Sequence, residues 1–167
     1  MVDFDDVPSR RPPSADGARR VIEHLGLGAH PEGGWFRRTW TSPERLAGEG
    51  AGDVEPLGDR AAGSSILYLL GAEEVSHWHR IDASEAWQHA AGAPLRLSTW
   101  RPDDVSVSHE TLGPDLLDGQ VPQHVVDPGC WQSARSLGAW SLVVCVVVPE
   151  FLAEGFELAA PGWTPPV

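Results

Sequence analysis

The chain has few basic residues and no long apolar run. Its 24 acidic residues against 12 lysines and arginines give a formal net charge of −12 at pH 7, and such a chain would repel the phosphates of nucleic acid. No apolar run reaches the roughly 18 residues that a membrane-spanning helix needs. The N-terminal segment "MVDFDDVPSRRPPSADG" has neither the apolar core nor the cleavage pattern of a secretory signal. We therefore predict a cytoplasmic protein without nucleic-acid or membrane partners.

Several enzyme motifs are missing as well. The sequence contains no glycine-rich phosphate loop, no Gly-x-Ser-x-Gly and no Cys-x-x-Cys, which removes the nucleotide-hydrolase, serine-hydrolase and zinc-ribbon interpretations. The two cysteines, Cys130 and Cys145, stand in apolar surroundings without a secretory context. We expect both to be buried free thiols.

The beginning of the chain predicts a tail followed by a short helix. Residues 1–15 are rich in proline, arginine and aspartate, and we expect them to be disordered. Asp16 is the expected N-cap of a helix with one apolar stripe, which Gly26 or Gly28 ends.

The rest of the chain is a series of short segments with the composition of β-strands. They read "WFRRTW", "SSILYLL", "VSHWHRI", "EAWQHAA", "PLRLSTW", "VSVSHETL", "HVVDPG", "WQSARS" and "WSLVVCVVV". Many short strands with frequent turn residues, and no strand–helix–strand alternation, indicate an all-β sandwich or barrel. Residues 43–63 lack aromatic and β-branched runs, so we expect a flexible loop there. We predict one domain over residues 16–162, with a short tail over residues 163–167.

The stretch "SHWHRIDASEAWQHAAG" concentrates titratable side chains. Because side chains alternate along a strand, we expect His77 and His79 on one face. On the next strand, Glu85, Trp87 and His89 should likewise share a face. A hairpin with both faces inward would bring two imidazoles and a carboxylate together, a donor set that suits a divalent transition metal. The same residues could instead form a metal-free acid–base centre or a hydrogen-bonded polar wall.

This stretch resembles the first motif of the cupin superfamily. The pattern is a glycine, five residues, His77-x-His79, a five-residue gap, Glu85, six residues and a second glycine. The second cupin motif usually supplies a histidine, and in "VVDPGCWQSAR" that place is held by Gln132. The usual fourth metal ligand is therefore absent, and a glutamine carbonyl binds metal weakly compared with imidazole.

Further motifs narrow the resemblance to a family of small single-domain cupins of largely unassigned function, which open with His-Pro-Glu-Gly-Gly. They are "HPEGGWFRRTW", "SSILYLL", "SHWHR", "SEAWQHAAGAPLRL" and "WSLVVCVVVPEF", and they cover about residues 20–160. The resemblance implies a cupin jelly-roll β-barrel, a homodimer, and a small-molecule pocket inside each barrel. Glu150 departs from the glycine usual in the closing motif, and we attach no function to it.

Other residues are candidates for such a pocket. Glu32 is a candidate carboxylate because the opening motif lies near the barrel in this family. Arg37 shares a face with Trp35 and could meet an anionic substrate, whereas Arg38 points the other way. Tyr68, the only tyrosine, could act as a general acid opposite a histidine base, as in the deoxysugar epimerases of the cupin superfamily. Each candidate also has a purely structural alternative. The opening motif could serve only as a turn, either arginine could form a surface ion pair, and Tyr68 could pack in the core with its hydroxyl hydrogen-bonded. The remaining ligand-contact candidates are Trp87, His89 and Gln132.

Three functions are compatible with these residues. An isomerase-, epimerase- or cyclase-like enzyme would use a histidine made more basic by Glu85 to abstract a proton next to a carbonyl. A metal-dependent oxygenase or lyase would hold iron, manganese, nickel or zinc at His77, His79 and Glu85, with Gln132, His89 or water completing the site. A non-catalytic protein would bind a small ligand in the same pocket. The missing second-motif histidine favours the metal-free enzyme.

Overall fold

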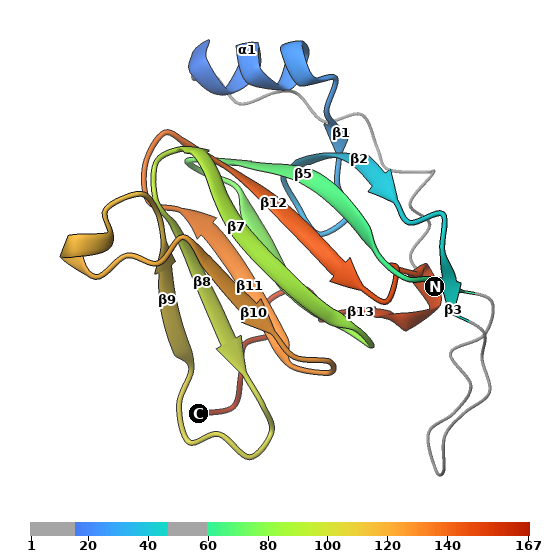
Figure 1. Ribbon diagram of the computed structural model, residues 1–167. Coiled ribbons are helices and arrows are strands. Elements are labelled where there is room, and N and C mark those ends of the chain that lie inside the picture. Colours follow the sequence, from blue (N-terminus) through green and yellow to red (C-terminus); the bar gives the residue numbers. More distant parts are fainter. Residues whose placement is uncertain (1–15, 47–59) are drawn as a thin grey trace.

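The computed structural model describes residues 16–46 and 60–167, which form two antiparallel sheets that face one another (Figure 1). The six-stranded sheet runs in the order β1 (Gly28–Ala29), β2 (Trp35–Thr41), β5 (Ser64–Gly71), β12 (Trp140–Val148), β7 (Ser84–Gly92) and β10 (Gln123–Val126). The five-stranded sheet runs in the order β13 (Phe156–Leu158), β6 (Val75–Ile81), β11 (Trp131–Ser136), β8 (Leu95–Trp100) and β9 (Ser108–Leu112). Two short turns of 3-10 helix, Leu116–Asp118 and Ala153–Gly155, lie between strands.

The predicted all-β jelly roll with a short N-terminal helix is confirmed. Each of the strand segments expected from the sequence contains or overlaps an observed strand. The two sheets form a sandwich and do not close into a hydrogen-bonded barrel. An isolated bridge between Leu112 and Val121 links their edges near β9 and β10.

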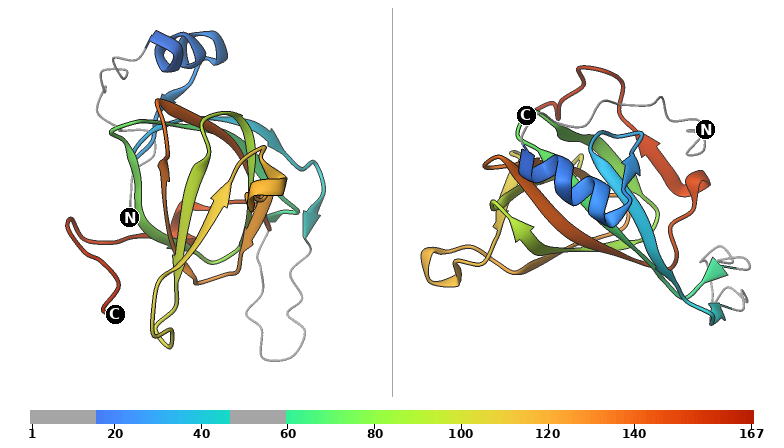
Figure 2. Two further views of the ribbon diagram at one scale, coloured as in Figure 1. Left: turned by 90° about the vertical axis from the view of Figure 1, so that its left-hand side faces the viewer. Right: turned by 90° about the horizontal axis from the view of Figure 1, so that it is seen from above.

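Helix α1 (Asp16–Leu25) covers one end of the six-stranded sheet, as the view from above shows (Figure 2). Ile22 is buried in a cluster with Trp35, Leu69 and Leu142. The helix stops at Gly26, whose φ of +62° is a left-handed conformation that glycine adopts at little cost. The expected helix and its glycine stop are therefore confirmed.

The space between the sheets divides into a packed half and a hollow half. On β5 the inward side chains of the packed half are Leu70 and Tyr68, which belong to the main apolar cluster. Further along the same strand, Ile66 and Ser64 line a cavity instead. The strands thus pass from a close-packed core, which stabilises the fold, to a chamber that can receive a ligand.

Two expected boundaries change. Trp163 packs against Trp131 with ring centroids 4.6 Å apart and also contacts Trp78 and Trp100, so the domain includes Trp163, which the sequence placed in a tail. The expected loop over residues 43–63 contains a two-stranded ladder of β3 (Arg45–Leu46) and β4 (Arg60–Ala61). Residues 47–59, and the expected tail 1–15, lie outside the described residues.

Two further expectations concern the cysteines and the membrane. Cys130 and Cys145 are both buried and unpaired, as predicted. No helix within residues 16–46 and 60–167 is long and apolar enough to cross a membrane.

The tight turn before β2 requires glycine at position 34. Gly34 has a φ of +70°, and a Cβ atom there would lie 2.6 Å from the carbonyl oxygen of Leu69 and 2.7 Å from Cδ2 of Leu70. At Gly26, with a φ of +62°, a Cβ atom would meet nothing within 4 Å. The two glycines share a backbone conformation and differ in the space around them.

We expect Gly34→Ala to lower the free energy of unfolding by about 3 kcal/mol, because left-handed strain and overpacking add. Gly26→Ala, which suffers only the strain, should lose about 1 kcal/mol. Urea unfolding followed by tryptophan fluorescence measures both losses. Equal losses in the two variants would contradict this account of the turn.

Candidate active site

A β-bulge in β6 decides which histidine faces the interior. β11 pairs with β6 through Gln132 and His79 and through Ala134 and Ser76, so one residue of β11 lies opposite two residues of β6. Ser76 and His79 are buried, whereas His77 is exposed. The prediction that His77 and His79 share a face is therefore wrong, because the extra residue turns the His77 imidazole to solvent.

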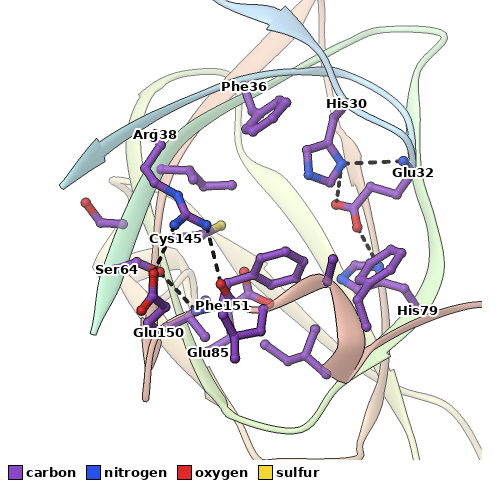
Figure 3. A pocket seen from close by; sticks show the side chains of 17 residues that line it. His30, Glu32, Phe36, Arg38, Ser64, His79, Glu85, Cys145, Glu150 and Phe151 are labelled. Atoms are coloured by element: carbon purple, nitrogen blue, oxygen red, sulfur yellow. Dashed lines mark hydrogen bonds and ion pairs between the residues drawn. The ribbon is translucent and has the colours of Figure 1, made fainter. Parts of the chain in front are cut away.

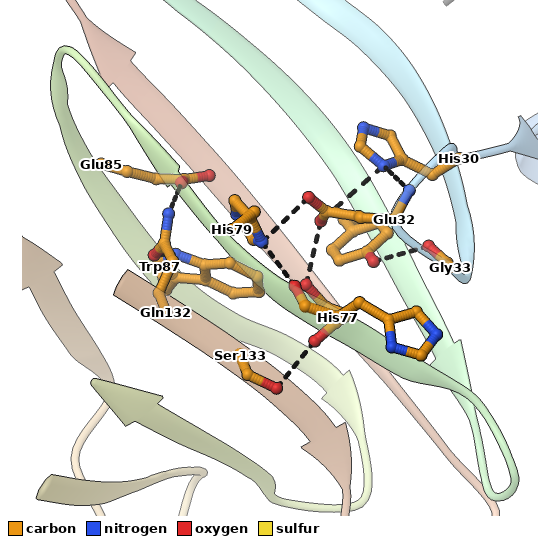
Figure 4. A network of polar contacts seen from close by, with 11 residues as sticks. His30, Glu32, Gly33, His77, His79, Glu85, Trp87, Gln132 and Ser133 are labelled. Atoms are coloured by element: carbon orange, nitrogen blue, oxygen red, sulfur yellow. Dashed lines mark hydrogen bonds and ion pairs between the residues drawn. The ribbon is translucent and has the colours of Figure 1, made fainter. Parts of the chain in front are cut away.

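The bulge places Glu32 in contact with three residues of β6 (Figure 4). Ser76 Oγ donates to Glu32 Oε1 at 3.0 Å, and His79 Nδ1 lies 3.1 Å from Glu32 Oε2. The backbone N–H of His77 donates to the carbonyl oxygen of Glu32 at 2.9 Å. His77 therefore contributes to the site through its backbone rather than through its imidazole.

The contacts of His79 define its tautomer. Nδ1 lies 2.8 Å from the carbonyl oxygen of His77, and a carbonyl oxygen can only accept, so we place the proton of the neutral ring on Nδ1. Nε2 then carries the lone pair. Burial lowers the pKa of His79, which the charge of Glu85 and the His77 carbonyl partly oppose. A neutral imidazole with a free lone pair is thus favoured on the cavity wall.

Gln132 and Trp87 hold the second carboxyl group. Gln132 Nε2 donates to Glu85 Oε2 at 2.6 Å, and Trp87 Nε1 donates to Gln132 Oε1 at 2.9 Å. The indole contact fixes which end of the amide faces Glu85. Burial raises the pKa of Glu85, which favours the neutral carboxyl, whereas the contacts with His79 and Gln132 oppose that shift.

His30 is a member of the site that the sequence did not nominate. The backbone N–H of Glu32 donates to His30 Nδ1 at 3.4 Å, which places the proton of the neutral ring on Nε2. The His30 ring packs edge-on against the Phe36 ring, with the two ring centroids 4.5 Å apart. Burial lowers the pKa of His30 and raises that of Glu32. In the sequence, the one feature that could have indicated His30 is its place in the same motif as Glu32, two residues away.

The imidazoles of His30 and His79 and the two carboxyl groups line a cavity of about 340 Å³ between the two sheets (Figure 3). Its titratable side chains include two from the turn before β2, one each from β6 and β7, and one from β12. They are Glu32, His30, His79, Glu85 and Cys145. Aromatic and aliphatic side chains form most of the remaining wall, and they include Phe36, Ile66, Ile81, Val147, Phe151 and Phe156.

The structure reverses the expected orientation of the two arginines in β2. Trp35 packs against the cluster under α1, so Arg37, which shares its face, points away from the cavity. Phe36 and Arg38 line the cavity instead. The alternation was correctly predicted, but the sequence could not tell which face was the inner one. Glu150, to which no function was attached, also lines the cavity.

Two other candidates lie outside the cavity wall. Tyr68 is buried, and its hydroxyl donates to the carbonyl oxygen of Gly33 at 2.6 Å, so it supports the turn and is not placed to protonate a ligand. His89 pairs with Val143 of β12 in the same register as Glu85 and Trp87, and its Nε2 contacts the carbonyl oxygen of Ala93 at 3.1 Å. Neither residue, nor Trp87, lines the cavity.

The residues present do not fit the metal that the cupin resemblance implies. Within the described part of the chain, no group of three or more His, Cys, Asp or Glu side chains is arranged to hold a metal ion. The His77 imidazole faces solvent, and both polar atoms of the Gln132 amide are engaged by Glu85 and Trp87. The expected set of His77, His79 and Glu85 is therefore not assembled.

We expect added manganese, iron, nickel or zinc to leave the melting temperature of the tag-free protein unchanged, because no three donors converge. Differential scanning fluorimetry with metal and with EDTA makes this measurement, and His77→Ala should respond as the wild type does. A metal-dependent rise that disappears in His79→Gln would overturn this reading of the donor set.

Glu85→Gln should stabilise the protein at alkaline pH. The folded-state pKa of Glu85 is raised above its ordinary value of 4.5, so above that pH the native state holds a proton that the unfolded state has lost. Wild-type stability then falls as the pH rises through this window. The variant lacks this loss and keeps an oxygen that can accept from Gln132. We expect equal melting temperatures near about pH 4 and a gain of about 3 °C near about pH 8.

The matched control for this experiment is Glu73→Gln, which removes an exposed carboxylate and should not reproduce the alkaline gain. A Glu85→Gln protein that is less stable than the wild type at both pH values would show that the charge itself holds the site together.

Comparison with known proteins places this chain in a family. The chain matches the family described as Cupin superfamily (DUF985) over residues 19–159. No protein with a curated functional description gives a significant match.

Solved structures show the same relationship. A hypothetical protein from Leishmania major is 26% identical, with a TM-score of 0.75 over 86% of this chain and 87% of that one. A protein from Shewanella oneidensis is 36% identical, with a TM-score of 0.73 over 86% and 84%. A mutant of Bacillus subtilis oxalate decarboxylase, 13% identical with a TM-score of 0.55 over 78% of this chain and 29% of that one, shares the fold alone. The chain therefore belongs to the cupin superfamily, in the family DUF985.

Proposed function

We propose that this protein catalyses proton transfer at a carbon next to a carbonyl in a small molecule bound in the cavity, as an isomerase or epimerase does. The observation that carries the proposal is the contact of His79 Nδ1 with Glu32 and with the carbonyl oxygen of His77. It leaves the basic Nε2 for a ligand. A second carboxyl group, Glu85, lines the same cavity.

His79 has the features of a general base. Its ring is held by two acceptors on the Nδ1 side, which fixes both the tautomer and the direction of Nε2. Glu32 lies where it stabilises the imidazolium that forms when Nε2 takes a proton. Burial keeps the resting imidazole neutral, so the base is ready at neutral pH.

Glu85 supplies the complementary acid. Its raised pKa favours the protonated carboxyl, and Gln132 occupies Oε2, so a ligand carbonyl can meet Oε1. A neutral carboxyl group in a buried site can donate to the oxygen on which charge develops. The two groups thus have pKa values shifted in opposite directions, which is the arrangement that separates acid from base.

The step balances with these groups and solvent protons. Nε2 of His79 takes the proton from the substrate carbon, and the C–H electron pair becomes the C=C bond of an enol. The carbonyl π pair moves to oxygen, which is hydrogen-bonded or protonated by Glu85. Delivery of a solvent proton to the opposite face of the same carbon completes an epimerisation, with Glu85 taking its proton back from the enol oxygen and His79 releasing its proton to solvent. An isomerisation needs a hydroxyl group on that carbon: the former carbonyl carbon is then protonated, and the hydroxyl gives its proton to Glu85 and becomes the new carbonyl.

Two further observations support this reaction class. None of the 167 residues is lysine, so the chain cannot activate a carbonyl through an imine with its own side chain. The cavity also lacks a converging set of metal ligands among the described residues. Hydrogen bonding from a buried carboxyl group is a way to stabilise the enolate that needs neither an imine nor a metal.

We expect the protein to exchange the acidic C–H protons of small oxo compounds for deuterium in D₂O, which proton NMR follows directly. His79→Gln should slow this exchange by about 100-fold or more, because a general base contributes about 10² to 10⁴. His77→Gln is the matched control: its imidazole lies two residues away on the same strand but faces solvent.

Equal losses in the two variants would refute the assignment of His79 as the base. If compounds bind in the cavity and no exchange occurs, the protein is a non-catalytic ligand-binding cupin.

A further inference from the structure

We infer that Arg38 binds the carboxylate of the substrate, so that the molecule turned over is a small oxo acid with an apolar group. This inference rests on the proposed proton transfer for the reaction, and adds to it the chemical class of the ligand and the residue that selects it.

Arg38 is placed to act as the anion-binding group of the cavity. Among the described residues that line the cavity, it is the only arginine, and none is lysine. It projects from β2 on the opposite side of the cavity from His30 and Glu32 (Figure 3). An acid bound at Arg38 therefore extends toward the proton-transfer groups.

The present contacts of Arg38 are long for a charge-assisted hydrogen bond. Nη1 lies 3.4 Å from Glu150 Oε1, and Nη2 lies 3.5 Å from the carbonyl oxygen of Phe151. Arg60, by contrast, binds Asp82 with two bonds of 2.9 and 3.0 Å. Charge-assisted N–H···O bonds are usually about 2.7–2.9 Å. Arg38 therefore retains donor capacity that a ligand carboxylate can use in a planar, two-bond geometry.

Glu150 does not depend on Arg38 for its own hydrogen bonding. Its Oε2 accepts from the backbone N–H of Ala61 at 2.9 Å, and its side chain is only 12% exposed, against 41% for Arg38. Turning Arg38 toward a ligand therefore leaves the Glu150 carboxylate with a backbone partner. Ligand binding then exchanges the long Arg38–Glu150 ion pair for a shorter, two-bond ion pair between Arg38 and the ligand carboxylate.

The apolar side chains that line the cavity favour a ligand with an apolar group. Phe36, Ile66, Val147 and Phe156 line the same cavity as Arg38 and the proton-transfer groups. At about 340 Å³ the cavity is near the lower limit of ligand pockets, which are about 300–1,000 Å³. A small acid with a short aliphatic or single aromatic group fits these walls, and its oxo group then lies toward Glu85 and His79.

The test compares an acid with its neutral amide in matched variants. The probes are pyruvate and phenylpyruvate, each with the corresponding amide, titrated against the protein and followed by ligand-observed NMR. Arg38→Met should weaken binding of the better acid by about 10-fold or more, as loss of a charge-assisted pair does, and leave the amide unchanged. Arg37→Met, which removes the neighbouring arginine on the opposite face, should change neither. Arg38→Lys should restore part of the affinity.

Each result decides the inference. If neither acid binds the wild type more tightly than its amide, or if Arg38→Met leaves acid binding unchanged, Arg38 is not the carboxylate site. If the acid binds through Arg38 but His79-dependent deuterium exchange is absent, Arg38 is the carboxylate site of a ligand that is not turned over, and the proposed reaction fails. If acid and amide exchange with equal KM, the reaction stands and the inference fails.

Discussion

The site depends on one extra residue in β6. Without the bulge opposite β11, strict alternation would put His77 and His79 on the same face and Ser76 on the other. With it, Ser76 and His79 both reach the carboxylate of Glu32. His77, one of the two residues between them, turns its N–H and C=O toward the site and its imidazole outward. A local defect in the ladder thus builds a carboxylate–imidazole pair from a regular strand.

The buried titratable groups of the site lower the stability of the fold. Burial shifts the pKa values of His30 and His79 downward and those of Glu32 and Glu85 upward, so each charged form is disfavoured and each group lowers stability when it must ionise. The packed half of the sandwich, built on Tyr68, Leu70, Trp87, Leu95 and their neighbours, supplies the apolar burial that offsets this loss. Placing reactive groups at the hollow end leaves the close-packed end intact.

Gln132 shows how one substitution changes the chemistry that a cupin fold supports. An imidazole at this position would offer a lone pair to a metal, whereas an amide offers both a donor and an acceptor. Here the donor holds Glu85 and the acceptor is engaged by Trp87. The carboxyl group is thereby tethered to β11, an arrangement that supports the acid–base chemistry we propose for this cavity.

Local patterns in the sequence determined the strands, the N-terminal helix with its glycine stop, the buried free cysteines, and the importance of Glu32, His79 and Glu85 as candidates. These follow from composition, alternation and turn residues, which act over a few neighbouring positions. Only the tertiary structure decided that His77 faces solvent, that Arg38 rather than Arg37 meets the cavity, and that His30 joins the site. Each of these depends on which side of a strand another sheet covers, or on a bulge defined by a partner strand about 55 residues away in sequence. Such long-range pairing leaves no mark on the alternation of the strand itself.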